Sequence, residues 1–281
     1  MADWIRRSAD PKVVLVAVLA IIMATPYLPS VFLPPISPWT RDFYNVVQSL
    51  HPGDVVVFQA GSPYGLTDYS EEYNFLHIVL KSIWNTGARI IYYEGAAVNV
   101  PISEAVRVNA WGKDWKSNVE YGKRFVYLGV VDKPVAFVNF LRSPWTTMPF
   151  DNYGDPIANM EIAKAFKDAS DAKIIVNGLE GVTSLKPEYK YKILSTGGAA
   201  ATSGQGVSFY TSGLYDGIVG GNTGGLEYSV LSGIPAPLCS PYFNGYVLIS
   251  SLAIGLILWS NIRERIAPTK RKVVEWSGRA E

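Results

Sequence analysis

Two long uncharged hydrophobic runs, one near each end of the chain, constrain the fold more than any other feature. The first covers 21 residues, Val13 to Leu33, and the second covers 20, Phe243 to Ile262. About 20 apolar residues in a helix span a hydrocarbon core of about 30 Å. Both runs are therefore predicted to be transmembrane helices, and residues 13–33 are predicted to form an uncleaved signal anchor.

The two runs differ in how strongly they indicate a membrane span. Pro26 and Pro29 would kink or end a helix in the second half of the first run, so a cleavable signal peptide is the main alternative there, with a buried core helix as another. An A-x-A-type cleavage pattern is missing near its end. The second run carries Tyr246 and Trp259 near its ends, as interfacial aromatic anchors do. It is the stronger prediction.

Basic residues flank the outer side of each run. Residues 1–12 hold three Lys or Arg, and residues 263–281 hold six. The positive-inside rule then places both of these tails in the cytoplasm. Residues 36–242 become one extracytoplasmic domain of a two-pass protein of the cell membrane.

Charge and cysteine content exclude several classes of protein. The central 36–242 segment has 16 Lys and Arg against 19 Asp and Glu, and the whole chain has a net charge of +1. Nucleic-acid binders usually carry a basic surplus, so no nucleic-acid partner is predicted. The single cysteine, Cys239, excludes an intramolecular disulfide and a cysteine-rich zinc site.

The central segment alternates runs of β-branched and aromatic residues with segments of helical period. This alternation is typical of βα units and a parallel sheet. We therefore predict an α/β fold, a Rossmann-like, doubly wound and mostly parallel sheet of five or six strands. The predicted strands are Asp54–Ala60, Ala88–Tyr93, Arg124–Val131, Lys173–Asn177, Tyr191–Ser195 and, as a sixth, Gly217–Gly220. The predicted helices are Ser70–Asn85, Ser103–Trp115, Val135–Leu141, Asp155–Ala169 and Gly225–Leu231. The aromatic stretch Ser143–Gly154 has no periodicity, and either an ordered functional loop or a plain connector would explain it.

Glycine and small polar residues follow several of the predicted strands. Doubly wound sheets bind ligands at the carboxyl ends of their strands, where glycine lets the backbone approach a ligand closely. A polar, uncharged or anionic small molecule fits such an edge. The predicted ligand-binding residues are Ser62, Asn177, Glu180, Thr196, Gly197, Gly198, Gly221, Asn222, Thr223 and Glu227. The plainer interpretation is that these glycines only make tight turns.

The tracts 196–206 and 220–225 are predicted to form two walls of this site, joined by Ser62 and Asn177. Because a glycine at the rim of a site contributes little packing, Gly221→Val is expected to lower ligand affinity and to leave the core intact.

Motifs that carry catalysis are missing. The chain has no G-x-x-x-x-G-K-[ST], no G-x-G-x-x-G after the first strand and no G-x-S-x-G. Its two histidines, His51 and His77, are interpreted as structural, and no catalytic residue, metal ligand or cofactor is predicted. Glu94, Glu180 and Glu227 remain as strand-end carboxylates that could act in acid/base chemistry.

The sequence therefore leaves three functions open. The first is a membrane-anchored, non-enzymatic binding or assembly subunit, with the lipid bilayer, other membrane-protein subunits or a second copy, and a small polar ligand as its partners. The alternative is a membrane-bound hydrolase or transferase that uses strand-end carboxylates. The third is a structural part of a larger membrane complex.

The predicted orientation can be tested by cysteine accessibility. Because residue 118 lies in the domain predicted to be extracytoplasmic, Asn118→Cys should react with a membrane-impermeant maleimide in intact cells. Ser277→Cys, in the basic tail, should react only after permeabilisation, and the wild type, with Cys239 alone, gives the background. Protection of residue 118 in intact cells would reverse the orientation.

Overall fold

The computed structural model describes residues 11–25, 33–60, 66–131, 134–177, 190–202 and 204–266. Internal contacts divide the chain into two compact units. Leu33–Ser240 form the α/β unit, and residues 1–32 and 241–281 form the helical unit. Each unit is described by itself.

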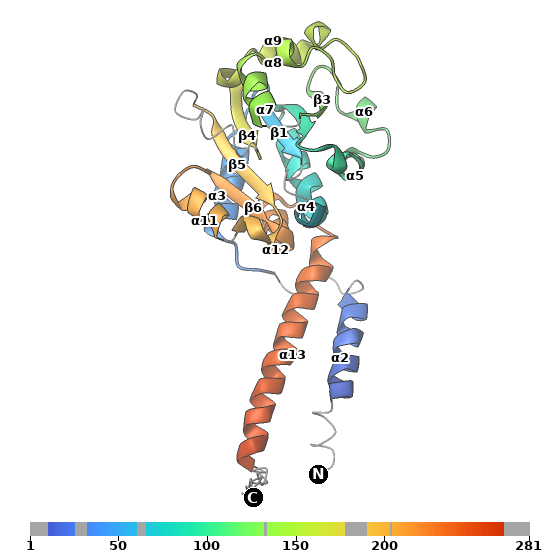
Figure 1. The fold of residues 1–281 in the computed structure, drawn as a ribbon, viewed down its shortest axis with the longest axis vertical. Coiled ribbons are helices and arrows are strands. Elements are labelled where there is room, and N and C mark those ends of the chain that lie inside the picture. The colour runs from blue at the N-terminus through green and yellow to red at the C-terminus, as the bar shows by residue number, and fades with distance from the viewer. Residues whose placement is uncertain are drawn as a thin grey trace, which may run out of the picture. The chain divides into compact units, whose positions relative to one another are not determined.

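The α/β unit is built on a six-stranded sheet in which every neighbouring pair is parallel (Figure 1). Its strands are β1 Val55–Ala60, β2 Arg89–Glu94, β3 Phe125–Val130, β4 Ala172–Val176, β5 Lys192–Gly197 and β6 Gly217–Gly220. The strand order is β3-β2-β1-β4-β5-β6. The predicted Rossmann-like parallel sheet is confirmed, with six strands at the predicted places.

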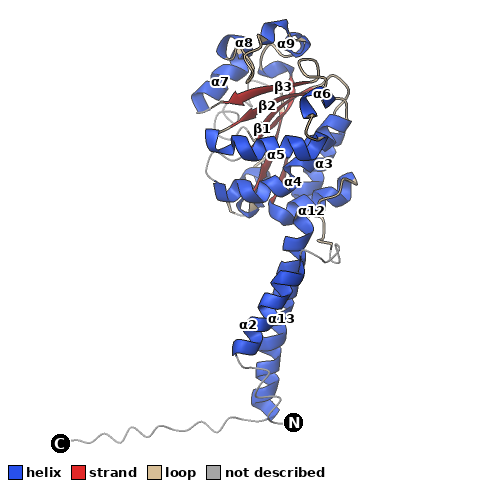
Figure 2. Cartoon of the chain, turned by 90° about the vertical axis from the view of Figure 1, so that its right-hand side faces the viewer, coloured by secondary structure: helices blue, strands red, loops and turns tan. Residues whose placement is uncertain are grey.

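Helices cover both faces of the sheet, which is why its strands are so apolar (Figure 2). All six residues of β1 are buried. One face packs against α4 (Leu66–Asn85), α5 (Val100–Trp111) and α12 (Gly221–Ser232). The other carries a large aromatic and aliphatic core, to which α7 (Pro134–Arg142) contributes Phe137 and Phe140.

A helix that the sequence analysis did not predict, α3 (Pro38–Gln48), covers the β6 edge of the sheet. The Thr40 hydroxyl donates to the carbonyl of Ile218 at 3.3 Å, which satisfies an edge acceptor. A Cβ atom at Gly217 would lie 2.4 Å from the Cα of Phe43, so only glycine allows this approach. Thr40 and Phe43 are buried on one face of α3 and are three residues apart in the sequence. This helical spacing is the signal that could have revealed α3.

Three predicted helix starts are wrong by a few residues. The helix predicted from Ser70 begins at Leu66. The helix predicted to begin at Ser103 begins at Val100, because Pro101 lies in its first turn, where no backbone N–H is needed. The helix predicted from Gly225 begins at Gly221, directly after β6.

The single helix predicted over Asp155–Ala169 is wrong. Only the short α9 (Glu161–Ala165) is α-helical there, between the 3₁₀ turns η3 (Ile157–Asn159) and η4 (Ala169–Asp171). Met160 and Phe166 interrupt the helix with extended backbone. Phe166 is fully buried and packs on Phe140 and Trp145, so tertiary packing overrides local helix propensity here.

The stretch Ser143–Gly154 is packed rather than loose. It contains a helical turn, α8 (Pro144–Thr147). The Trp145 indole donates to the carbonyls of Ala163 and Phe166, at 3.1 and 2.7 Å. The remaining short elements are η2 Ala97–Asn99, α6 Trp115–Asn118, η5 Ala199–Thr202 and α11 Gln205–Thr211.

The helical unit contains α2 (Pro11–Ala24) and most of α13 (Cys239–Ile266). Within the described residues, one helix is long and apolar enough to cross a membrane, over Cys239–Trp259, with a mean hydropathy of 1.6. Helix α2 has 14 residues, of which Val14–Ala24 form a shorter apolar helix. Residues 26–32 of the predicted first span lie outside the described part of the chain. A Cβ atom at Gly245 would contact the Thr25 side chain at 3.3 Å, so the end of α2 lies beside α13.

The approach of α3 to β6 predicts a large stability effect. Gly217→Ala should lower the free energy of unfolding by about 2 kcal/mol or more, because the added methyl meets backbone atoms that cannot turn aside. Gly53→Ala is the control, since Gly53 has open space and only its φ of 94° resists a side chain, at a cost of about 1 kcal/mol. Chemical denaturation of the detergent-solubilised protein measures both. Equal effects would show that α3 can shift away from β6.

Candidate functional site

The carboxyl ends of all six strands lie at one edge of the sheet, because all the strands are parallel. The strand order changes direction between β1 and β4, which are neighbours in the sheet although β2 and β3 intervene in the sequence. Doubly wound sheets bind their ligands at such a switch point, outside the carboxyl ends of the strands. This carboxyl edge is the candidate site.

Asn177 connects the strands on either side of the switch point. It directly follows β4 and has a left-handed backbone, with φ of 64°. Its side-chain Nδ2 donates to the Gln59 carbonyl of β1 at 3.2 Å, to Glu72 Oε1 at 3.0 Å and to the Thr196 hydroxyl. Its Oδ1 accepts from the backbone N–H of Thr196 at 2.5 Å. The Thr196 hydroxyl in turn donates to Glu72 Oε1. Predicted site residues Asn177 and Thr196 are therefore brought together.

Glu72 is a central member of this edge that the sequence analysis missed. It lies on α4 and is fully buried. Phe75, Leu76 and Val79 follow it at positions +3, +4 and +7 and are also fully buried. This helical spacing puts Glu72 on the core face of α4, and an acidic residue on an apolar stripe is the signal that would have identified it.

The two glycine tracts lie side by side, as predicted. Gly197 of β5 pairs with Gly220 of β6. A Cβ atom at Gly220 would lie 2.5 Å from the Thr202 side chain and 3.3 Å from the carbonyl of Gly198. Close packing of one tract on the other therefore explains why glycine is needed at position 220.

Gly221 was predicted to be a rim residue with little packing, and the structure differs from this prediction. It is buried, begins α12 and has a φ of 62°. A valine there would strain the backbone, since β-branched residues rarely adopt positive φ. Gly221→Val would thus destabilise the fold and is not a clean test of ligand binding.

The other predicted site residues have mixed outcomes. Half-buried Asn222 accepts a hydrogen bond from Asn74 of α4 at 2.7 Å, and Thr223 is exposed.

Glu227 accepts from the backbone N–H and the hydroxyl of Ser37, at 3.1 and 2.5 Å. Ser37 precedes α3, so Glu227 places a carboxylate at a helix N-terminus, which is a structural role. Ser62 and Glu180 lie outside the described residues.

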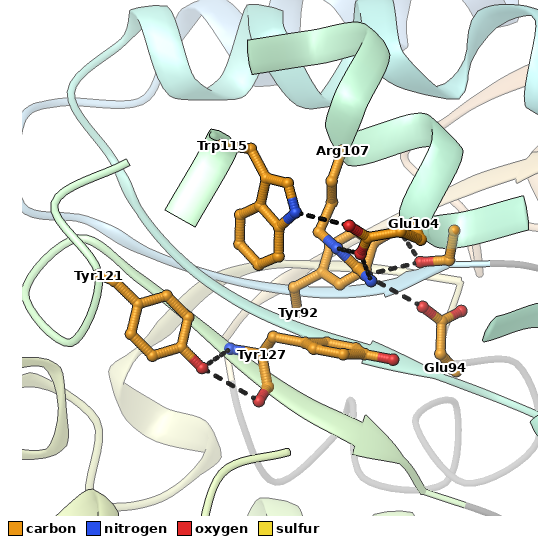
Figure 3. A network of polar contacts seen from close by, with 8 residues as sticks. Tyr92, Glu94, Glu104, Arg107, Trp115, Tyr121 and Tyr127 are labelled. Carbon is orange, nitrogen blue, oxygen red and sulfur yellow. Dashed lines mark hydrogen bonds and ion pairs between the residues drawn. The ribbon is translucent and has the colours of Figure 1, made fainter. Parts of the chain in front are cut away.

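A second polar cluster surrounds Arg107 of α5, on the same face of the sheet as α4 (Figure 3). The Arg107 side chain is only 1 % exposed, and its guanidinium lies 3.9 Å from the centre of the Tyr127 ring. Glu104 accepts from its Nε at 3.2 Å and from its Nη2 at 2.7 Å. Glu94, the last residue of β2, is 3.4 Å from its Nη1.

The charges of this cluster do not balance. Two hydrogen bonds pair Arg107 with Glu104, so Glu94 is a second carboxylate facing one cation. Burial raises the pKa of Glu94 to about 8, the negative charge of Glu72 adds to the rise, and Ser103 and Arg107 oppose it. Glu94 Oε2 has no hydrogen-bond partner among the residues that the structure describes. A buried carboxyl group of raised pKa at a strand end can bind a polar group or hold a proton.

The described part of the chain shows no group of three or more His, Cys, Asp and Glu side chains that could hold a metal ion. His51 is exposed and precedes β1, at the opposite end of the sheet, where it pairs with Asp54 at 3.8 Å. His77 is buried within α4, and burial lowers its pKa.

The raised pKa of Glu94 predicts a pH dependence of stability. The pKa of about 8 lies above the ordinary 4.5, so the folded protein binds this proton more tightly than the unfolded chain does. The resulting stabilisation is complete below about pH 4.5 and is lost as the pH rises through 8. Glu94→Gln carries no titrating proton, so it should flatten this decline, which amounts to a few kcal/mol in order of magnitude.

Unfolding measured at pH 5, 7 and 9 checks this prediction. Glu120→Gln is the matched control, because Glu120 forms exposed ion pairs of small energetic weight with Lys123 and Arg124. An unchanged slope in Glu94→Gln would show that Glu94 is ionised at neutral pH in the folded protein.

No protein-family model and no curated protein matches this sequence. The site is therefore interpreted from its own geometry.

Proposed function

We propose that this chain is a membrane-anchored, non-enzymatic binding subunit, whose α/β unit holds a small polar ligand at the carboxyl edge of its sheet. One helix at each end anchors it in the cell membrane, and the α/β unit lies outside the cytoplasm. The hydropathy of Cys239–Trp259 supports the second anchor. The basic residues outside both apolar runs support the orientation.

The concentration of buried polar side chains at the carboxyl edge carries the proposal. Gln59, Glu72, Glu94, Asn177 and Thr196 are all less than 10 % exposed. Burying polar groups is costly, and apolar side chains would hold a plain scaffold together at a smaller cost. These side chains lie beside the switch point, which is where doubly wound sheets bind ligands.

One observation favours a second function, a membrane-bound hydrolase or transferase. The pKa of Glu94, raised by burial to about 8, suits a general acid at neutral pH. Against it, Glu227, another strand-end carboxylate considered from the sequence, is occupied by Ser37. The binding function is therefore preferred.

Native mass spectrometry of the full chain, extracted in mild detergent, tests the binding function. We expect a small molecule to be retained with the wild type. Thr196→Val should reduce the retained fraction about 10-fold, because it removes the hydroxyl that fixes Glu72 and Asn177. Thr211→Val is the control, since its exposed hydroxyl caps only a local carbonyl of α11.

The same spectra distinguish the other functions. A ligand-free mass that always includes further subunits would replace the binding function with a structural one. A retained molecule that the purified protein converts to a product of different mass would favour the enzyme.

A further inference from the structure

Three side-chain hydrogen-bond donors at the carboxyl edge are already used within the protein. Asn177 Nδ2 donates to three acceptors, and the Thr196 hydroxyl donates to Glu72. Asn74 Nδ2 donates to Asn222. A ligand that only accepts hydrogen bonds therefore gains little from these side chains.

The described residues at the carboxyl edge also offer no unpaired cation to an anionic ligand. No Lys or Arg is found in the described residues that directly follow the strands, such as 95–99, 198–202 and 221–225. Arg107, the cation of the neighbouring cluster, is neutralised by Glu104. Phosphate and carboxylate ligands, which the sequence alone left open, thus lose support.

Two buried oxygen atoms of the Arg107 cluster have no hydrogen-bond partner in the described part of the chain. They are Oε2 of Glu94 and the hydroxyl of Tyr127, and both residues are at most 1 % exposed. In Figure 3 the phenol of Tyr127 points toward Glu94. Burial raises the pKa of Tyr127 to about 12, and the charge of Glu94 contributes to this rise. Buried polar atoms without a partner are rare, and a bound group is one of the explanations for them.

Both atoms can donate as well as accept a hydrogen bond. The Tyr127 hydroxyl always can, and the Glu94 carboxyl group can when protonated. A hydroxyl on the ligand pairs with such groups in every protonation state, because one oxygen atom both donates and accepts. An ammonium group, in contrast, requires the ionised carboxylate.

We propose that Glu94 and Tyr127 bind the hydroxyl groups of a neutral, polyhydroxylated ligand, a free sugar or the sugar of a nucleoside. This inference rests on the proposed binding function and specifies its ligand class. Glu94 ends β2 and pairs in the sheet with Ala60, the last residue of β1, so the contact lies next to the switch point.

The most direct variant is Tyr127→Phe. It removes a hydroxyl that has no hydrogen-bond partner among the described residues, so the unliganded protein should lose little stability. Affinity for ribose or adenosine, measured by calorimetry on the full chain in detergent, should fall about 3- to 10-fold. Binding of ribose and adenosine alike indicates a free sugar, and binding of adenosine alone indicates a nucleoside.

Two substitutions at Glu94 complete the test. Glu94→Gln keeps a group that donates and accepts, so its affinity should stay within about threefold of the wild type, whereas Glu94→Met should lose about 10-fold or more. Inorganic phosphate and spermidine serve as anionic and cationic probes and should not bind.

The pH profile gives a readout that a merely structural role would not change. Wild-type affinity for the sugar should vary little between pH 6 and 9, while a cationic ligand would bind more tightly as Glu94 ionises. The titratable and charged groups that face Glu94 come from each element packed against it: Glu72 of α4, Glu104 and Arg107 of α5, Tyr92 of β2 and Tyr127 of β3.

Three results would overturn the inference. The first is unchanged affinity in both Tyr127→Phe and Glu94→Met, and the second is binding of phosphate or spermidine in place of the sugars. The third is no binding of ribose or adenosine at millimolar concentration. A retained small molecule without hydroxyl groups in the native spectra would overturn the ligand class and leave the binding function standing.

Discussion

Parallel strand pairing is the constraint on which the rest of this structure depends. Parallel neighbouring strands cannot be joined by hairpins. After each strand, the chain must cross back to the other end of the sheet before the next parallel strand can begin. Crossovers place helices on both faces, which makes strands such as β1 apolar throughout. They also bring every carboxyl end to one edge, where polar residues distant in the sequence, such as Glu72 and Thr196, meet.

Helix α12 links this edge to the rest of the α/β unit. Its first turn lies at the end of β6, where Asn222 bonds to Asn74 of α4. Further along, the hydroxyl of Tyr228 donates to Ser82 of α4 at 2.9 Å. A Cβ atom at Gly225 would collide with Phe75 at 2.4 Å, so glycine lets α12 and α4 pack closely. The position of the edge is therefore fixed from two helices as well as from the strands.

The Arg107 cluster shows how a charge is kept in the core of this domain. Aromatic rings of Tyr92, Trp115 and Tyr127 surround the guanidinium, which is weakly hydrated and stacks well on such faces. The Trp115 indole donates to Glu104 at 2.9 Å and so holds the carboxylate that balances the charge. Arg107 also donates to Glu94 Oε1, at the longer distance of 3.4 Å, and Glu94 Oε2 has no hydrogen-bond partner among the described residues.

The sequence by itself determined the mostly parallel sheet of five or six strands and the apolar run at 243–262, because both follow from residue periodicity. That the strands' carboxyl ends share one edge then follows from the geometry of parallel sheets. The sequence also placed Asn177, Thr196 and the two glycine tracts together correctly. Only the tertiary structure decided that Glu72 joins them, that Glu227 caps α3 and that Asp155–Ala169 breaks into short turns. These outcomes depend on which side chains meet across distant segments and on how deeply they are buried, and neither quantity is present in local sequence.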